Sequence, residues 1–205
     1  MPGFEIIDKK EKQAVNKLFD ESSILMAHGF ENIRKNFHVR SFEKNFSKKI
    51  KSKYALAVSS GTAAIKIALK AINIKPGDEF IAPSYTFVST INAFMMRGGI
   101  PKFVDIRSDT LNIDENLIEK SITKKTKAIV VVHYAGVACE MKRIIEIGEK
   151  YKIPIIEDNA HGLFAKYNSE YLGTLGDFST TSFHETKNER SECYLWRRNF
   201  CTPLF

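Results

Sequence analysis

The sequence has few cysteines, no leader-like start and no long apolar run. Its three cysteines, Cys139, Cys193 and Cys201, are odd in number and widely spaced, which excludes a disulfide framework and favours a reducing compartment. The first residues, MPGFEIIDKKEK, lack the apolar core of a signal peptide. No apolar run approaches the length of about 18 residues that a membrane span needs. The sequence therefore predicts a cytoplasmic protein without a membrane partner.

Internal repeats, low-complexity linkers and nucleic-acid-binding signatures are also missing. The formal charge of +7 is concentrated in the first 53 residues, which hold twelve Lys and Arg against seven Asp and Glu. The lysines follow helix-like spacing, so they form either a solvated helix surface or a patch for an anionic partner. No helix-turn-helix, zinc or RNA-binding pattern accompanies them, and we expect neither a nucleic-acid partner nor a metal site.

The composition is that of a globular chain with one sizeable core, because 43% of the residues are hydrophobic and 27% are charged. Residues 1–53 form the first predicted part, a segment of helices joined by loops, with 41–50 helical. From residue 54 the pattern changes to short, nearly all-apolar runs. The predicted strands are 54–58, 79–82, 102–106, 127–132, 153–157 and 178–183.

Helix-like stretches separate most of these runs, at 61–73, 85–97 and 139–151. Strands that are apolar throughout are typical of a sheet buried on both faces. The alternation of strand and helix therefore predicts an α/β fold with a mainly parallel sheet flanked by helices. The stretch 163–177 contains Gly173 and Gly176 and predicts a hairpin or an extended loop.

Ligands of open α/β sheets bind at the carboxyl ends of the strands, so the residues there are the first candidates for a site. The run 54–58 is followed by SSGTAAI, a turn of small residues that opens a helix. The backbone N–H groups of Gly61, Thr62 and Ala63 suit a phosphate, although an ordinary strand-to-helix turn has the same composition. The run 79–82 is followed by Tyr85 and Phe87, which either face a flat ligand or pack in the helix core.

Asp158 directly follows the apolar run 153–157, where an unpaired carboxylate would be costly to bury. A protonated heterocyclic nitrogen is a suitable partner, and His161 is close enough to contact the same ligand. The alternative is a helix N-cap at Asp158 with His161 on the surface.

The last predicted strand leads through Ser182 to Lys187. A lysine desolvated at that place can be neutral and nucleophilic toward an aldehyde, although a surface lysine has the same spacing. The case rests on the set of groups at successive strand ends: a phosphate turn, an aromatic ring, a carboxylate, a hydroxyl and a lysine. These are the parts that a pyridoxal 5'-phosphate (PLP) site requires.

Four stretches resemble the DegT/DnrJ/StrS-type sugar aminotransferases, over about residues 50–188. They are PGDEFIAPSYTFVSTINAFMMRGGIPKFVDI, DTLNIDENLIEKSITKKTKAIVVVHYAGVACEM, EDNAHG and SFHETKN. The resemblance implies the large domain of a fold type I PLP-dependent transferase, similar to aspartate aminotransferase.

The resemblance also implies roles for the candidate residues. Lys187 would bind PLP covalently, Asp158 would pair with the pyridinium nitrogen, and Phe87 would stack on the ring. His161 stands where many members have Gln, near the phenolic oxygen of the cofactor. The phosphate would be bound by a further group of residues, namely Gly61, Thr62, Ala63 and Ser182.

The activity implied by the resemblance is transamination of a 4-keto-6-deoxy sugar nucleotide, of the dTDP-4-dehydro-6-deoxy-D-glucose type, with glutamate as the amino donor. Such reactions serve the biosynthesis of cell-surface polysaccharides such as lipopolysaccharide or enterobacterial common antigen. Related dehydratases have His in place of Lys187, so the lysine favours transamination. The family also implies a homodimer.

The resemblance stops after Asn188. Residues 189–205 contain the only Trp and two of the three Cys, and they show no helical or strand periodicity. We expect a partial PLP-binding domain at 54–188, an aberrant tail at 189–205 from a frameshift or a natural short form, and no C-terminal small domain. This predicts little or no turnover, and the alternative function is a non-catalytic remnant of such an enzyme.

Overall fold

The computed structural model describes residues 8–21, 29, 32 and 37–184. The chain divides into two compact units, Ser60–Phe183 on the one hand and Met1–Ser59 with His184–Phe205 on the other. The second of these contains α1 (Lys9–Glu21) and α2 (His38–Ile50), so the helix predicted at 41–50 is confirmed. No described helix is long and apolar enough to cross a membrane.

The strand predicted at 54–58 is wrong. This stretch has the composition of a strand, but it forms none, and Tyr54 and Leu56 are 79% and 64% exposed. A strand is stable only where its backbone groups pair with a neighbour. Among the described residues no strand pairs with 54–58.

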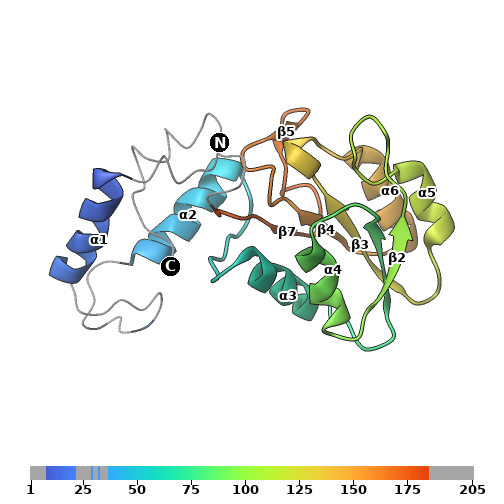
Figure 1. The fold of residues 1–205 in the computed structure, drawn as a ribbon, viewed down its shortest axis with the longest axis horizontal. Helices are drawn as coiled ribbons and strands as arrows, with labels where there is room; N and C mark the ends of the chain where they lie inside the picture. The colour runs from blue at the N-terminus through green and yellow to red at the C-terminus, as the bar shows by residue number, and fades with distance from the viewer. Residues whose placement is uncertain (1–7, 22–28, 30–31, 33–36, 185–205) are drawn as a thin grey trace. The chain divides into compact units, whose positions relative to one another are not determined.

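The unit Ser60–Phe183 is built on a five-stranded parallel sheet with the order β2-β1-β3-β4-β7 (Figure 1). The strands are β1 (Glu79–Pro83), β2 (Ile100–Val104), β3 (Thr126–Val132), β4 (Ile155–Asp158) and β7 (Phe178–Thr180). The mainly parallel sheet flanked by helices is therefore confirmed, and the other five predicted strands agree with observed ones to within a few residues.

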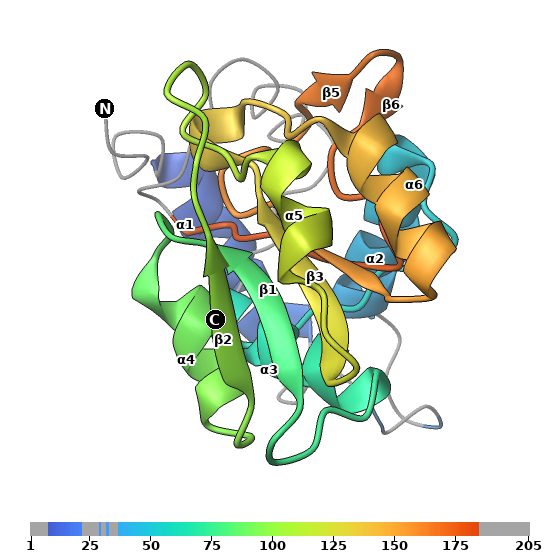
Figure 2. The same cartoon turned by 90° about the vertical axis from the view of Figure 1, so that its right-hand side faces the viewer.

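Helices cover both faces of this sheet (Figure 2). One face carries α3 (Gly61–Ala71) and α4 (Val88–Met95), and the other carries α5 (Glu115–Ser121) and α6 (Met141–Tyr151). The helices predicted at 61–73, 85–97 and 139–151 correspond to α3, α4 and α6. The short helix α5 was not predicted; it begins where the side chain of Asp114 accepts the backbone N–H of Asn116 (2.9 Å).

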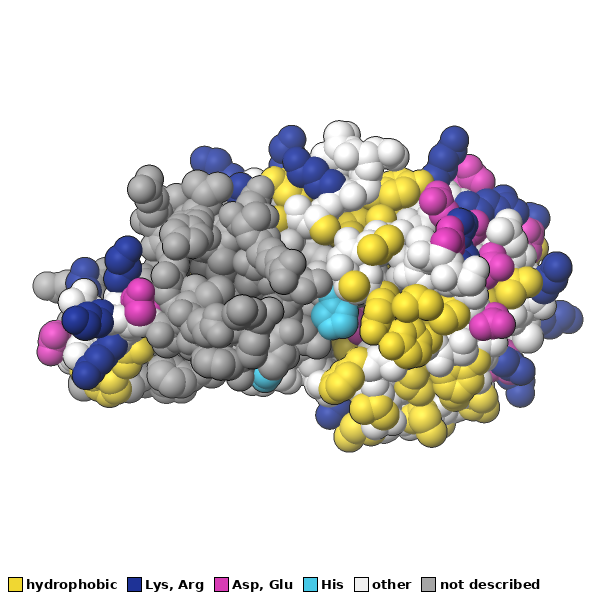
Figure 3. All heavy atoms as spheres, turned by 45° about the horizontal axis from the view of Figure 1, so that its top comes forward, with side chains coloured by type: hydrophobic (Ala, Val, Ile, Leu, Met, Phe, Trp, Pro, Cys, Tyr) yellow, Lys and Arg dark blue, Asp and Glu magenta, His cyan; other side chains and the backbone are white. Residues whose placement is uncertain are grey.

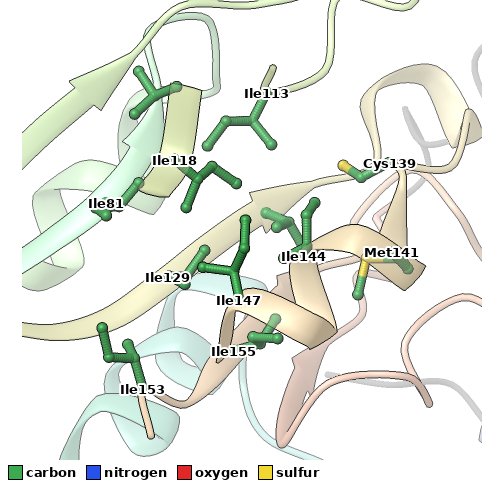
Figure 4. Packing of buried hydrophobic residues seen from close by; sticks show 12 residues of the cluster. Ile81, Ile113, Ile118, Ile129, Cys139, Met141, Ile144, Ile147, Ile153 and Ile155 are labelled. Atoms are coloured by element: carbon green, nitrogen blue, oxygen red, sulfur yellow. The ribbon is translucent and has the colours of Figure 1, made fainter. Parts of the chain in front are cut away.

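Each face has its own hydrophobic cluster. The cluster under α5 and α6 includes Ile129, Ile144, Ile147 and Ile155, all buried (Figure 4). The cluster under α3 and α4 includes Leu69, Phe80, Phe94 and Ile156. Because side chains alternate along a strand, Ile155 and Glu157 lie on the α5/α6 face of β4, whereas Ile156 and Asp158 lie on the α3/α4 face.

The stretch between β4 and β7 contains the predicted hairpin. Its strands, β5 (Lys166–Tyr167) and β6 (Glu170–Tyr171), are antiparallel. The chain then turns through residues 173–176 and enters β7. This turn lies on the α5/α6 side of β4, because its backbone donates hydrogen bonds to Glu157.

Candidate functional site

Asp158 is the last residue of β4, and its side chain lies on the α3/α4 face with only 6% of the residue exposed. The Thr90 hydroxyl on α4 donates to Oδ2 (2.6 Å), and the backbone N–H of Ala160 donates to Oδ1 (3.2 Å). The residues after Asp158 form a turn and no helix, so the alternative of a helix N-cap is wrong. A carboxylate has about four acceptor positions, so two donors leave it able to accept from a cationic ligand.

Thr90 is a site residue that the sequence did not single out. Its hydroxyl lies between Asp158 and the Thr86 hydroxyl, which is 3.2 Å away. This chain of hydroxyls fixes the orientation of the carboxylate from the first turns of α4. A Thr within this helix gave no signal, because its partner is on a distant strand.

The candidate phosphate turn is the first turn of α3. Ser60 caps the helix, and its hydroxyl accepts the backbone N–H of Ala63 (3.1 Å). Ser182, just beyond β7, lies beside this turn: a Cβ added to Gly61 would be 3.7 Å from the Ser182 Cβ and 3.9 Å from its Oγ. The N–H groups of a first helical turn have no acceptor within the helix, so Gly61 and Thr62 offer donors and a positive dipole end next to a hydroxyl, whereas the Ala63 N–H is already bonded to the Ser60 hydroxyl.

Phe87 directly precedes α4 and is 66% exposed, so the interpretation as helix-core packing is wrong for this residue. Its carbonyl accepts the backbone N–H of Thr90 (3.0 Å), which ties it to the helical turn that holds Asp158. The place of this ring, directly before α4, is compatible with contact to a flat ligand. Tyr85 is also exposed, but its hydroxyl is hydrogen bonded to that of Tyr134 (2.9 Å).

His161 lies beside the loop that follows β3. Its Nδ1 accepts the backbone N–H of Ala135 (3.3 Å), which leaves Nε2 as the protonated nitrogen in the neutral ring. The ring stands edge-on to Tyr134, with centroids 5.8 Å apart. The hydrogen bond between the Tyr134 and Tyr85 hydroxyls raises the pKa of Tyr134. His161 is therefore connected to Tyr85 through Tyr134.

Asn112 holds this loop in place and was not recognised from the sequence. Its Oδ1 accepts the Tyr134 N–H (2.9 Å), and its Nδ2 donates to the Val137 carbonyl (3.0 Å). Between them Ala135 has a left-handed conformation with φ 51°. An alanine there is strained, so the loop needs this buried clamp.

Glu157, the neighbour of Asp158 on β4, is fully buried on the opposite face together with His133. Its Oε2 lies 2.9 Å from Nε2 of His133. Burial alone would raise the pKa of Glu157, but the His133 bond and the donors of the 173–176 turn outweigh burial and lower the pKa. The sequence indicated neither partner, because both lie far along the chain.

Lys187 lies outside the described residues, as does the tail 189–205. The geometry of the site therefore comes from Gly61, Phe87, Asp158, His161 and Ser182 with their neighbours. All of them belong to the unit Ser60–Phe183.

The described residues fit PLP. A helix N-terminus beside a serine hydroxyl suits its phosphate, and a buried carboxylate suits its pyridinium nitrogen. The fold and site together define an α/β protein with a candidate site for an anionic ligand at the carboxyl ends of its parallel strands.

The chain belongs to the DegT/DnrJ/EryC1/StrS aminotransferase family, which matches residues 6–189. It is 42% identical over 150 residues to the spore coat polysaccharide biosynthesis protein SpsC of Bacillus subtilis, covering 73% of this chain and 39% of SpsC. It is 38% identical over 178 residues to GDP-perosamine synthase of Escherichia coli O157:H7, covering 87% of this chain and 47% of that enzyme. The chain thus spans less than half the length of these curated relatives.

Among solved structures, Spr1654 of Streptococcus pneumoniae in its PLP form is similar in fold and in sequence. The TM-score is 0.82 at 28% identity, over 91% of this chain and 49% of that one. The large-domain fold expected from the sequence is confirmed, and the expected cofactor agrees with the PLP held by this neighbour.

Proposed function

We propose that this chain is the cofactor-binding part of a PLP-dependent sugar-nucleotide aminotransferase. The observation that carries the proposal is the buried Asp158 carboxylate, held by Thr90 at the strand ends on the same sheet face as the α3 turn. Membership in an aminotransferase family supports the reaction class.

In the proposed site, PLP supplies an electron sink for the carbon from which a proton is removed. Asp158 keeps the ring nitrogen protonated, and Thr90 keeps the carboxylate aimed at it. Gly61, Thr62 and Ser182 would bind the phosphate through N–H and hydroxyl donors, and Ala63 would join them by exchanging the Ser60 hydroxyl for a phosphate oxygen. Lys187 would hold the cofactor, and its amine would be the group that moves a proton during the reaction.

Two further roles belong to the aromatic side of the site. Phe87 covers one face of the cofactor ring. His161 donates from Nε2 toward the phenolic oxygen, in the place of the Gln of many family members. The Ala135 N–H bond to Nδ1 supports this role, because it leaves the proton on Nε2.

The substrate we propose is a 4-keto-6-deoxy sugar nucleotide of the dTDP-4-dehydro-6-deoxy-D-glucose type, aminated as by dTDP-4-amino-4,6-dideoxygalactose transaminases. Glutamate is the proposed donor, and cell-surface polysaccharide biosynthesis in the cytoplasm is the proposed setting. The names of SpsC and GDP-perosamine synthase support a role in polysaccharide or sugar biosynthesis.

We also propose a homodimer. Hydrophobic side chains gather on the surface of the unit Ser60–Phe183 (Figure 3). Several large ones on α4, on the residue that follows it and on β2 are exposed. They are Val88, Met95, Met96, Ile100 and Phe103. Exposed apolar surface of this kind supports an interface between subunits.

The test is a titration of the purified chain with PLP, followed by absorbance in the visible region and by a dissociation constant. Lys187→Ala should abolish the visible band, and Asp158→Asn should weaken binding. Amino transfer is then measured from glutamate to dTDP-linked and GDP-linked 4-keto sugars. No saturable PLP binding would contradict the proposal, and binding without transfer would favour the non-catalytic remnant.

A further inference from the structure

The Glu157 carboxylate collects four hydrogen bonds on the side of β4 that faces away from the candidate site. Its Oε2 accepts from His133 Nε2 (2.9 Å) and from the backbone N–H of Gly173 (2.8 Å). Its Oε1 accepts from the backbone N–H groups of Leu175 (2.8 Å) and Gly176 (2.6 Å). Every acceptor position of the carboxylate is therefore used by the protein itself.

The donor role of His133 follows from its second ring nitrogen. Nδ1 accepts the backbone N–H of Cys139 (3.2 Å), so the proton of the neutral ring is on Nε2 and is directed at Glu157. His133 and Glu157 are both fully buried. The pair thus presents one fixed carboxylate to the turn 173–176.

That turn determines where β7 begins. Gly173 has φ +87°, and a Cβ on Gly176 would lie 3.0 Å from the Ile155 carbonyl, so the chain passes directly over the start of β4. The next residue, Asp177, is bonded to Ile155 twice: its N–H donates to the Ile155 carbonyl (3.0 Å), and its carboxylate accepts the Ile155 N–H (2.8 Å).

The register of β7 against β4 follows from this anchoring. Phe178, Ser179 and Thr180 pair with Ile156, Glu157 and Asp158, respectively. Two residues later the chain places Ser182 beside Gly61. A slip of one residue would move Ser182 by about 3.3 Å and turn its side chain to the other face of the sheet.

We propose that Glu157, oriented by His133, is a positioning residue that sets the register of β7 and thereby places the Ser182 hydroxyl at the phosphate turn of α3. The inference rests on the proposed function, since it takes Ser182 to be a phosphate ligand. Glu157 touches no ligand in this arrangement, because its side chain is on the opposite face from Asp158. Its effect reaches the site through the turn and the strand.

The test compares the binding of two ligands, PLP and 5-deoxypyridoxal, which has the same ring and aldehyde but no phosphate. The ratio of their affinities measures the contribution of the phosphate site. In Glu157→Gln an NH₂ group replaces one of the two carboxylate oxygens, and each of these oxygens accepts from two donors. In either orientation of the amide, the NH₂ group therefore faces two N–H groups that it cannot accept from. We expect about 10-fold weaker PLP binding, the cost of one charge-assisted hydrogen bond, with 5-deoxypyridoxal binding unchanged.

Ile144→Val is the matched control for a general loss of stability. It removes one buried methyl group from the cluster under α6 and leaves all four hydrogen bonds of Glu157 in place. We expect the wild-type affinity ratio in this variant. A Glu157→Gln chain that keeps the wild-type ratio, or loses affinity for both ligands equally, would overturn the proposal.

A double-mutant cycle adds a second criterion. If Glu157 acts through Ser182, the double variant Glu157→Gln/Ser182→Ala should bind PLP no more weakly than Ser182→Ala alone. Additive losses would show that Glu157 acts elsewhere.

Should Glu157→Gln fail to fold, His133→Asn replaces it, because Asn keeps the acceptor for Cys139 and loses only the donor to Glu157. A wild-type chain with equal affinity for both ligands would instead contradict the proposed phosphate site itself.

Discussion

Glu157 and Asp158 are neighbours on one strand and both are buried, yet they face opposite sides of the sheet in different electrostatic surroundings. Glu157 accepts four hydrogen bonds from the protein, whereas Asp158 accepts two in the described structure. A saturated carboxylate is a structural element, because it has no capacity left for a ligand. An oriented but unsaturated carboxylate at a strand end is what a cationic ring nitrogen requires. The number of hydrogen-bond donors around each carboxylate therefore distinguishes a structural role from a ligand-binding role. Burial does not distinguish them, because both carboxylates are buried.

The strongest way to test this comparison is to remove the saturated carboxylate. Glu157→Ala leaves three backbone N–H groups and His133 without their acceptor, and we expect a loss of about 3–5 kcal/mol in the free energy of unfolding. Urea unfolding followed by circular dichroism measures it. A loss below that of Ile144→Val would mean that water or rearrangement replaces the carboxylate.

Asp158→Asn should give the opposite pattern. The amide oxygen can still accept from Thr90, so we expect the free energy of unfolding to change by no more than about 1 kcal/mol. PLP binding should weaken by about 10-fold or more, because the ring nitrogen loses its ionic partner. The dissociation constant measured by titration checks this prediction. A variant that unfolds but binds normally would reverse the assignment of the two carboxylates.

The pH dependence of stability should also distinguish the two sites. The folded-state pKa of Glu157 is lowered, so its ionised form stabilises the fold above the unfolded-state pKa of Glu. This stabilisation is lost as the pH falls through the lower, folded-state pKa. The free energy of unfolding should fall in that acidic range for the wild type and less steeply for Glu157→Gln. Parallel curves for the two chains would contradict it.

Thr90→Val removes the hydroxyl that orients Asp158. We expect a several-fold loss of PLP affinity, smaller than in Asp158→Asn, since the carboxylate is still present but held by Ala160 alone. The titration is the same as for Asp158→Asn. An effect on PLP binding larger than that of Asp158→Asn would mean that Thr90 acts on more than the carboxylate.

The smallest expected effect is that of Tyr85→Phe. The hydroxyl pair Tyr85–Tyr134 is exposed, so stability should change by less than about 0.5 kcal/mol. The pKa of Tyr134 should fall toward its ordinary value, because the hydrogen bond between the two hydroxyls is the main cause of its increase. Ultraviolet titration of tyrosine ionisation measures the shift, with Tyr151→Phe as an exposed control outside this pair.

The sequence predicted what depends on local pattern. The apolar runs predicted the five strands of the sheet, and the residues that follow them led to Asp158 and Ser182. It failed where the outcome depends on distant partners. Residues 54–58 have a strand's composition, but no described strand pairs with them. Glu157 was taken only as the end of a strand, because His133 and the 173–176 turn are remote from it in sequence. Thr90 was missed for the same reason.

The contact between Gly61 and Ser182 has a consequence for synthesis. The two halves of the proposed phosphate site come from the beginning and the end of the unit Ser60–Phe183. At ordinary elongation rates the α3 turn leaves the ribosome on the order of ten seconds before Ser182 does. During that interval the first turn of α3 has only its cap, Ser60, and lacks Ser182. The cofactor can therefore bind to a complete phosphate site only after β7 has joined the sheet. Cofactor binding would then indicate that the last stage of assembly of this unit is finished.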